Sequence, residues 1–281
     1  MTRYYYTEED VRRLENQAAV LRGDILRMIA KAGAGHPGGS LSAVDMITAL
    51  YFHVLNIDPE RPDMPDRDRF VLSKGHACPA LYAALARRGY FDPAALETLR
   101  EYHSLLQGHP DMLKTPGVDF STGSLGNGLS VGLGMALSAR LHGQSYMTYV
   151  MLGDGELQEG LVWEAAMAAA HHKVGNLIAI VDANGVQING WVNDVMRIEP
   201  ISDKWKAFGW QVVECAGNNM REVLHALHTA KTMRAPAVIL MRTVKGRGVS
   251  FMEDDSLWHG KAPSEEQLLQ AIAEVEKGGI L

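Results

Sequence analysis

Residues 153–184 read GDGELQEGLVWEAAMAAAHHKVGNLIAIVDAN, and this stretch decides the fold class. An apolar, β-type run at residues 149–152 comes directly before it, and a second such run lies at residues 177–181. Between the two runs, a glycine-containing turn leads into residues 157–172, whose apolar side chains recur at the spacing of a helix. Strand, turn, helix and strand together predict one βαβ unit with two parallel strands.

Asp154 and Asn184 each follow one of these two predicted strands. Open α/β sheets place their ligand sites at the carboxyl ends of the strands. Carboxylate and amide oxygens are the ligands that Mg²⁺ prefers, and Gly155 and Glu156 begin the predicted helix, whose free N–H groups favour an anion. The stretch therefore predicts a diphosphate bridged by Mg²⁺. Taken singly, the same residues could cap a helix or close a turn.

Composition excludes several classes of protein. The chain has 281 residues, of which 47% are apolar and 21% charged, as in an ordinary soluble globular protein. A net charge of −6 offers no basic footprint for nucleic acid. The polar start predicts no signal peptide, and no apolar run approaches the roughly 18 residues of a membrane span. Two cysteines indicate a reduced, cytoplasmic setting rather than a disulfide framework.

Strand and helix patterns alternate along the whole chain, which predicts an α/β fold with a doubly wound parallel sheet and helices on both faces. We expect residues 1–281 to form a single domain, with residues 245–281 as a C-terminal loop and helix. The expected helices include 7–31 with Thr7 as N-cap, 41–54, 93–102, and a last one capped by Ser264 and ending at Gly278-Gly279. The expected further strands are 70–72, 210–214 and 237–243.

Four histidines lie in four separate glycine-containing loops: His36, His76, His109 and His259. A lone loop histidine is most often a solvated or hydrogen-bonded side chain, but four in the same kind of context indicate a site. Residues 122–130, TGSLGNGLS, place three glycines within six residues before a helix and predict a surface that a flat ligand approaches closely.

The string LGDGELQEG…NLIAIVDAN resembles the transketolase branch of the thiamine-diphosphate enzymes, and the resemblance runs from about residue 12 to about residue 264. It implies the diphosphate-binding fold of that family, with thiamine diphosphate and Mg²⁺ as cofactors and Ca²⁺ or Mn²⁺ as substitutes for the metal. It implies metal ligands in Asp154, Asn184 and the backbone carbonyl of Val186. It implies cofactor contacts from His76, Gly123, Leu125, Gly153, Asp154, Gly155, Glu156, Asn184 and His259.

The same resemblance assigns His36, His109 and His259 as catalytic residues that contact the sugar, a task that suits imidazole near neutral pH. Glu159 and Glu164 match a carboxylate relay near the subunit contact. Two positions depart from the pattern. Many transketolases have Asn where this chain has Lys74, which could reach the phosphates or point to solvent, and many have Pro at the position of Ser124.

The resemblance covers only the diphosphate-binding domain of a transketolase. The pyrimidine-binding domain, whose glutamate activates the cofactor, and the C-terminal domain are not matched. We therefore expect the N-terminal subunit of a split transketolase, active only with a partner chain in an α₂β₂ heterotetramer. The expected reaction transfers a two-carbon ketol unit from a ketose, or ketose phosphate, to an aldose or aldose phosphate, in the pentose phosphate route or elsewhere in carbohydrate metabolism.

Three alternatives stay open on the sequence. The chain could serve an enzyme resembling deoxyxylulose-phosphate synthase or a 2-oxo-acid dehydrogenase, or it could be a non-catalytic partner protein. The sequence leaves open the donor, the acceptor, the pathway and the identity of the partner.

Overall fold

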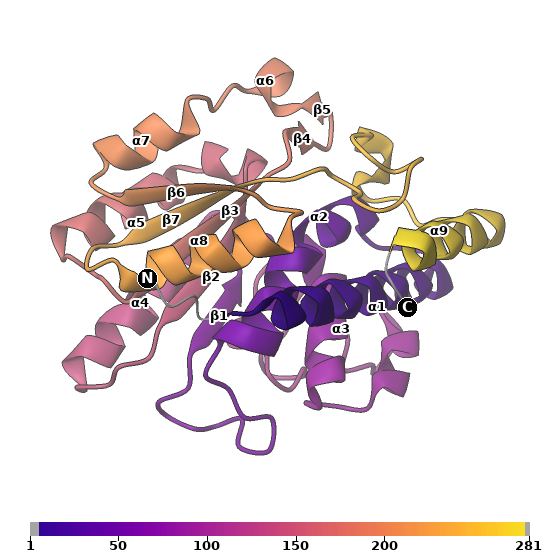
Figure 1. Cartoon of the computed structure of the whole chain (residues 1–281), viewed down its shortest axis with the longest axis horizontal. Coiled ribbons are helices and arrows are strands. Elements are labelled where there is room, and N and C mark those ends of the chain that lie inside the picture. Colours follow the sequence, from indigo (N-terminus) through magenta and orange to yellow (C-terminus); the bar gives the residue numbers. More distant parts are fainter. Residues whose placement is uncertain (1–5, 279–281) are drawn as a thin grey trace.

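The computed structural model describes residues 6–278 and contains a five-stranded parallel sheet with helices on both faces (Figure 1). The strand order is β1-β2-β3-β7-β6, and every neighbouring pair is parallel. The strands are β1 (Arg69–Leu72), β2 (Thr148–Gly153), β3 (Leu177–Ala183), β6 (Gln211–Ala216) and β7 (Ala237–Arg242). The predicted doubly wound sheet is confirmed.

Successive side chains of each strand pack into two different cores, because they point to opposite faces of the sheet. Tyr149 and Met151 of β2 belong to one core, and Val150 and Leu152 belong to the other. The first core is covered by α1 (Glu8–Ala32), α2 (Pro37–Ala49), α3 (Cys78–Arg88) and α8 (Met220–Thr232), with α9 (Glu265–Gly278) against α1. The second is covered by α4 (Asn127–Leu141), α5 (Gly160–His171) and α7 (Ile201–Ala207).

Helix α1 begins where its sequence predicts. Thr7 Oγ1 accepts the backbone N–H of Asp10 at 3.2 Å, and the Asp10 carboxylate accepts the backbone N–H of Thr7 at 2.9 Å, a reciprocal capping box. Ser264 makes the same pair of bonds with Gln267 before α9. The expected end of α9 at Gly279 lies outside the described residues.

Several expected boundaries were wrong. Helix α2 begins at Pro37 rather than at residue 41, because proline is well suited to a first helical turn. Residues 155–158 form a 3₁₀ turn (Gly155–Gln158), so α5 begins only at Gly160. The expected helix at 93–102 is a 3₁₀ helix, Pro93–Thr98.

The segment after Asn184, expected to be a loop, is a short antiparallel hairpin. It consists of β4 (Val186–Gln187) and β5 (Gly190–Trp191), and the short helix α6 (Val192–Val195) follows it. A single turn of π-helix, Leu50–Val54, extends α2.

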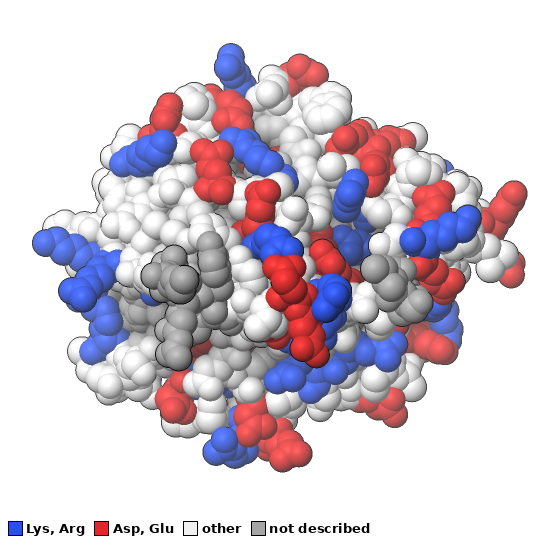
Figure 2. All heavy atoms as spheres, viewed as in Figure 1, with Lys and Arg blue, Asp and Glu red and all other residues white. Residues whose placement is uncertain are grey.

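The parallel arrangement brings the carboxyl ends of β1, β2, β3 and β7 to one edge of the sheet, which is where the site described below lies. Acidic and basic side chains are interspersed over the face shown in Figure 2. Within residues 6–278, no helix is long and apolar enough to cross a membrane.

Candidate active site at the carboxyl edge of the sheet

A cavity of about 360 Å³ lies at this edge of the sheet. Its walls come from the loops that follow β1, β2, β3 and β7, from the start of α2 and from the β4–β5 hairpin. The predicted residues that line it are His36, His76, Gly123, Leu125, Gly153, Asp154, Gly155, Glu156, Asn184, Val186 and His259. Of the predicted site residues, only His109 is not part of the lining.

The histidines form one cluster although they are far apart in the sequence. The ring centroids of His36 and His76 are 5.2 Å apart, those of His36 and His259 5.4 Å, and those of His76 and His259 5.1 Å. His109 lies at the side of this group, with its ring 6.4 Å from that of His36 and packed against Gly123. The structure thus brings all four predicted histidines together.

Burial keeps these imidazoles neutral. It lowers the pKa of His36 to about 4, with a further lowering by the nearby Arg100 charge. It lowers the pKa of His259 to about 3, assisted by the Lys245 charge. The pKa values of His76 and His109 are lowered for the same first reason. In addition, His36 Nδ1 is buried and has no hydrogen-bond partner in the described part of the chain, which suits contact with a bound molecule.

Three oxygen donors of the kind that hold Mg²⁺ line the cavity: the Asp154 carboxylate, the Asn184 amide and the Val186 carbonyl. Asp154 Oδ1 accepts the N–H of Gly155 at 2.7 Å, and Oδ2 accepts the N–H of Gly185 at 2.5 Å. Asn184 Oδ1 accepts the N–H of Val186 at 3.1 Å. These bonds hold the donors in place and leave lone pairs for a cation.

The charge balance at Asp154 also fits a cation. The residue is 5% exposed, and burial raises its pKa to about 6 against the lowering effect of the Gly185 N–H. Among residues 6–278, no side chain forms a salt bridge with it, and no cluster of three His, Cys, Asp or Glu offers another metal site. A divalent ion would supply the missing positive charge, because bound cations favour the ionised form of a nearby carboxyl.

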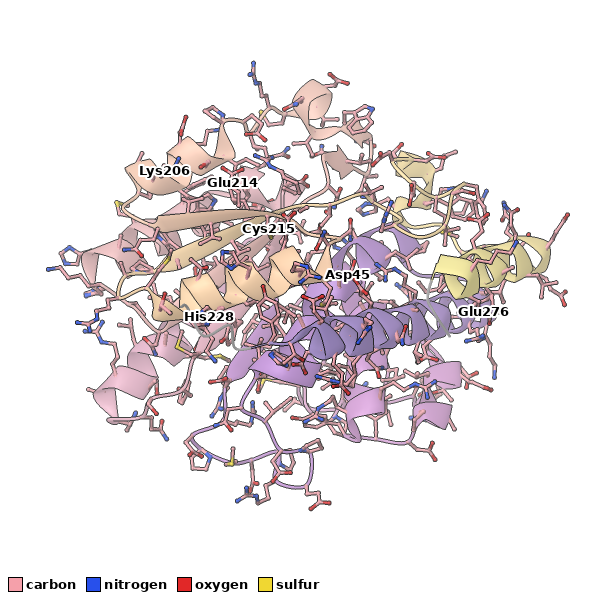
Figure 3. The ribbon with its side chains drawn as sticks, in the orientation of Figure 1. Asp45, Lys206, Glu214, Cys215, His228 and Glu276 are labelled. Atoms are coloured by element: carbon pink, nitrogen blue, oxygen red, sulfur yellow. The ribbon has the colours of Figure 1, made fainter. Side chains whose placement is uncertain are left out.

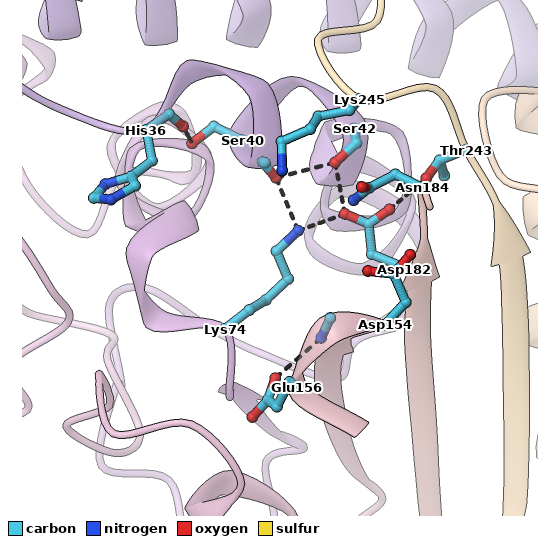
Figure 4. A network of polar contacts seen from close by, with 12 residues as sticks. His36, Ser40, Ser42, Lys74, Asp154, Glu156, Asp182, Asn184, Thr243 and Lys245 are labelled. Carbon is cyan, nitrogen blue, oxygen red and sulfur yellow. Dashed lines mark hydrogen bonds and ion pairs between the residues drawn. The ribbon is translucent and has the colours of Figure 1, made fainter. Parts of the chain in front are cut away.

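Lys74 does not point to solvent. It is 2% exposed, forms an ion pair with Asp182 on β3, and donates a second hydrogen bond to the Gly39 carbonyl at 3.0 Å (Figure 4). Asp182 is fully buried and also accepts hydrogen bonds from Ser42 Oγ at 2.6 Å and from Thr243. Burial alone would raise the pKa of Asp182, but Lys74 and the hydroxyl donors hold it below its ordinary value.

A second buried lysine, Lys245, follows β7. Its Nζ donates to the Val186 carbonyl at 2.7 Å and lies 3.0 Å from His259 Nδ1, and the side chain is 2% exposed. Burial, assisted by the nearby Lys74 charge, lowers the pKa of Lys245 to about 8. Because Lys74 also lines the cavity, two buried cations face the place where an anionic cofactor group would lie.

The Glu156 side chain stabilises the loops around the cavity. Its carboxylate accepts hydrogen bonds from Ser73, from the Gly126 N–H at 2.9 Å and from the Gly153 N–H at 3.0 Å. It therefore ties the loop after β1 and the 122–130 loop to the end of β2. We expected Gly155 and Glu156 to form an anion site at the start of a helix. They lie instead in a 3₁₀ turn, ahead of α5.

A larger cavity, of about 580 Å³, lies between α1, α9 and the loop after β7, but two of its arginines already pair with carboxylates of the same cavity. Arg22 binds Asp45 at 2.6 Å, and Arg247 binds Glu253 at 3.2 Å. The cavity at the carboxyl edge is therefore the better candidate site.

Sequence reasoning missed Asp182 and Lys245 and left Lys74 undecided. A signal for Lys245 was present, because it follows an apolar strand by three residues and so reaches the same sheet edge as Asp154. Asp182 gave no such signal, since an aspartate inside an apolar strand shows its role only when its partners are known.

The sequence of residues 14–275 matches the family model described as "Transketolase, thiamine diphosphate binding domain". The chain is 46% identical to a subunit of the 6-deoxy-6-sulfo-D-fructose transketolase of Clostridium sp. (strain MSTE9), over 95% of this chain and 97% of that protein. It is 42% identical to a subunit of the apulose-4-phosphate transketolase of Phocaeicola vulgatus, over 95% of each chain.

The structure superimposes on the crystal structure of transketolase from Campylobacter jejuni with a TM-score of 0.88 and 32% identity. That match covers 93% of this chain but 42% of the solved one, so the chain spans about two fifths of the transketolase that it matches. The subunit proteins, by contrast, are matched over nearly their whole length. The chain therefore belongs to the transketolase family, as the N-terminal, thiamine-diphosphate-binding subunit of a two-chain transketolase.

Proposed function

We propose that this subunit holds the diphosphate of thiamine diphosphate and a divalent metal in the 360 Å³ cavity, and that a second chain completes the active site over it. The observation that carries the proposal is the convergence of four loop histidines, three metal-type oxygens and two buried lysines at one sheet edge. Residues 1–281 would form a single diphosphate-binding domain, with 245–281 as its extension.

In this proposal, Asp154, Asn184 and the Val186 carbonyl hold the metal, with Mg²⁺ as the natural ion and Ca²⁺ or Mn²⁺ as substitutes. The backbone at Gly153 and Gly155 and the side chain of His76 contact the diphosphate. Lys74 and Lys245 lower the electrostatic cost of bringing a diphosphate into a buried site.

Gly123 and Leu125 would lie against the rings of the cofactor, because a glycine in the 122–130 loop lets a flat molecule approach the backbone. The bound cofactor supplies a carbanion-stabilising centre that the protein itself lacks.

The neutral histidines suit a polyhydroxy substrate. His36, His109 and His259 are proposed to donate hydrogen bonds to the carbonyl and hydroxyl oxygens of a sugar. A neutral imidazole donates a hydrogen bond from one nitrogen and accepts one at the other. It can therefore stay hydrogen-bonded to a hydroxyl or carbonyl oxygen while the charge on that oxygen changes, and it need not be a cation at the start.

The partner chain is proposed to bind the face formed by α4 and α5, which pack against each other. Both helices carry apolar residues on all sides, a pattern of helices that are buried in the complete assembly. On these two helices, Leu141, Leu161 and Met167 are 83%, 41% and 59% exposed. Gly160 and Leu161 directly follow Glu159 in the cavity wall, so the face is continuous with the proposed cofactor site.

The proposed partner carries the pyrimidine-binding and C-terminal domains, and the proposed assembly is an α₂β₂ heterotetramer. Replacing Met167 with Asp should prevent co-purification of the two chains without unfolding this one. Replacing Leu269 with Asp is the matched control, because Leu269 is also exposed, at 68%, but lies on α9. If M167D binds the partner as well as L269D does, the partner seats elsewhere.

The proposed reaction transfers a two-carbon ketol unit from a ketose to an aldose. The two relatives are named for ketoses with an anionic group, a sulfo group in one and a phosphate in the other. We therefore propose an anionic ketose as the donor. A cytoplasmic location is proposed as well, supported by Cys78 and Cys215, which are both free thiols.

The test is to co-express the chain with the product of its neighbouring open reading frame and to assay the purified complex. The donors are xylulose 5-phosphate, 6-deoxy-6-sulfo-D-fructose and apulose 4-phosphate, with and without thiamine diphosphate and Mg²⁺. Cofactor-dependent ketol transfer from one of these donors supports the proposal. A stable complex that binds no thiamine diphosphate would contradict it and would favour a non-catalytic role.

A further inference from the structure

Lys245 and His259 form a contact that the proposed function does not use. Lys245 Nζ lies 3.0 Å from His259 Nδ1, which is hydrogen-bond distance. The same Nζ donates to the Val186 carbonyl at 2.7 Å, so one of its protons is directed away from the histidine. Lys245 thus bridges the β4–β5 hairpin and the 3₁₀ turn Ser256–His259.

The chemistry of the two groups decides where the proton of the imidazole lies. An ammonium group has three donors and no acceptor, whereas a neutral imidazole has one donor nitrogen and one acceptor nitrogen. His259 Nδ1 must therefore accept, and the ring proton must be on the other nitrogen. We infer that Lys245 is a positioning residue that fixes His259 as its Nε2–H tautomer, so that His259 presents a hydrogen-bond donor to the cavity.

The surroundings of His259 agree with this arrangement. In the described part of the chain, no hydrogen bond is formed by His259 Nε2, and the residue lines the cavity beside His36 and His76. Burial and the Lys245 charge lower the pKa of His259 to about 3, so the ring is neutral at pH 7 and has a single proton to place. The site thus holds a neutral donor whose direction is set before any ligand arrives.

Packing holds Lys245 in the required position. A Cβ added to Gly38 would lie 3.1 Å from both Cγ and Cε of Lys245, which shows that the lysine stem runs directly over the backbone of α2. The Gly246 N–H also donates to the Gly38 carbonyl at 3.0 Å, which ties the backbone beside Lys245 to the same helix. The same Cβ would lie 2.9 Å from the Trp258 backbone carbonyl, so a side chain at position 38 would press on both Lys245 and the turn that carries His259.

The tautomer can be read directly by NMR on the full chain labelled with ¹⁵N in the histidine rings. Long-range ¹H–¹⁵N correlations distinguish a protonated from an unprotonated ring nitrogen, and the signals of His259 are identified by their loss in H259Q. We expect a protonated Nε2 and an unprotonated Nδ1 in the wild-type chain. A protonated Nδ1 in the wild type would overturn the inference, whatever the variants do.

Three variants test whether Lys245 is the cause. K245M removes the donor and should give two populated tautomers at His259, whereas K245R keeps a donor and should retain the single Nε2–H form. K204M is the matched control, because Lys204 also donates to a backbone carbonyl, that of Ile198, away from the histidine cluster. A K245M spectrum with a single Nε2–H tautomer, as in the wild type, would show that Lys245 does not fix the proton.

The measurement needs no cofactor, substrate or partner, so it succeeds or fails independently of the proposed function. In the active complex, the same variants separate positioning from simple structural support. K245R should recover at least part of the kcat that K245M loses. Equal losses in K245M and K245R would assign Lys245 a role other than donation to His259.

Discussion

Replacing Lys74 with Met should destabilise the chain strongly, because it leaves a carboxylate buried without a cation. Asp182 has no exposed surface, and Lys74 is its only ionic partner in the described part of the chain. Its remaining donors would be the hydroxyls of Ser42 and Thr243. Removing one member of a buried pair costs about 3–5 kcal/mol, which is a large share of the roughly 5–15 kcal/mol that stabilises a typical domain.

The double variant K74M/D182N isolates the cause. Asn keeps a group that can bond to the two hydroxyls but carries no charge, so the double variant should lie within about 2 kcal/mol of the wild type. Urea unfolding followed by tryptophan fluorescence gives the free energies of unfolding, with equal m-values as the check on two-state behaviour.

The control is R61A, which breaks the ion pair between Arg61 and Asp58 and should leave the free energy of unfolding nearly unchanged, since the Arg61 side chain is 68% exposed and solvent screens the pair. Two results would refute the reasoning about Lys74. One is a loss below about 1 kcal/mol in K74M, and the other is a double variant that is no more stable than K74M.

Three further outcomes are expected. In α4, G132A should lower the free energy of unfolding by about 1–3 kcal/mol, because its Cβ would lie 2.3 Å from a β2 side chain. G134A has open space around the new Cβ and should raise the free energy of unfolding by about 0.5–1 kcal/mol, so equal values for the two variants would contradict this expectation. Burial raises the pKa of both the Cys78 and Cys215 thiols to about 12 (Figure 3 labels Cys215 on β6). A thiol reagent at pH 8 should therefore modify neither cysteine in the folded chain and both in urea, and rapid labelling of the folded chain would contradict this expectation. Burial lowers the pKa of His36 from 6.5 to about 4, so between these two pH values the unfolded chain binds more protons than the folded chain. The free energy of unfolding should therefore fall as the pH drops from 6.5 to 4, by about 1–2 kcal/mol for this residue after allowance for solvent screening. H36N should show a shallower pH dependence of unfolding, and an unchanged slope would count against the assignment.

The fold class followed from the sequence because its signals are local and repeated. The apolar run before Gly153, the helical spacing after it and the second apolar run before Asn184 define parallel neighbours, and the structure pairs them as β2 and β3. The N-cap at Thr7 was predictable for the same reason, since a capping box needs only two residues three positions apart.

Boundaries near the site were less predictable because tertiary contacts decide them. The 3₁₀ turn after Gly153 exists because the Glu156 carboxylate turns inward to two backbone N–H groups and Ser73, and such a contact leaves no periodic signal. The Lys74–Asp182 pair joins residues 108 positions apart, so neither residue alone indicates the other. The histidines were found by their shared loop context, whereas their mutual distances had to come from the structure.

The central claim is that this chain supplies one half of a shared active site. The most direct test is to titrate it into a fixed amount of its partner, with thiamine diphosphate, Mg²⁺, a ketose donor and an aldose acceptor present, and to measure the rate of ketol transfer. We predict no activity for either chain alone, a linear rise, and a plateau at one copy of this chain per partner. Full activity of this chain without the partner would contradict the claim.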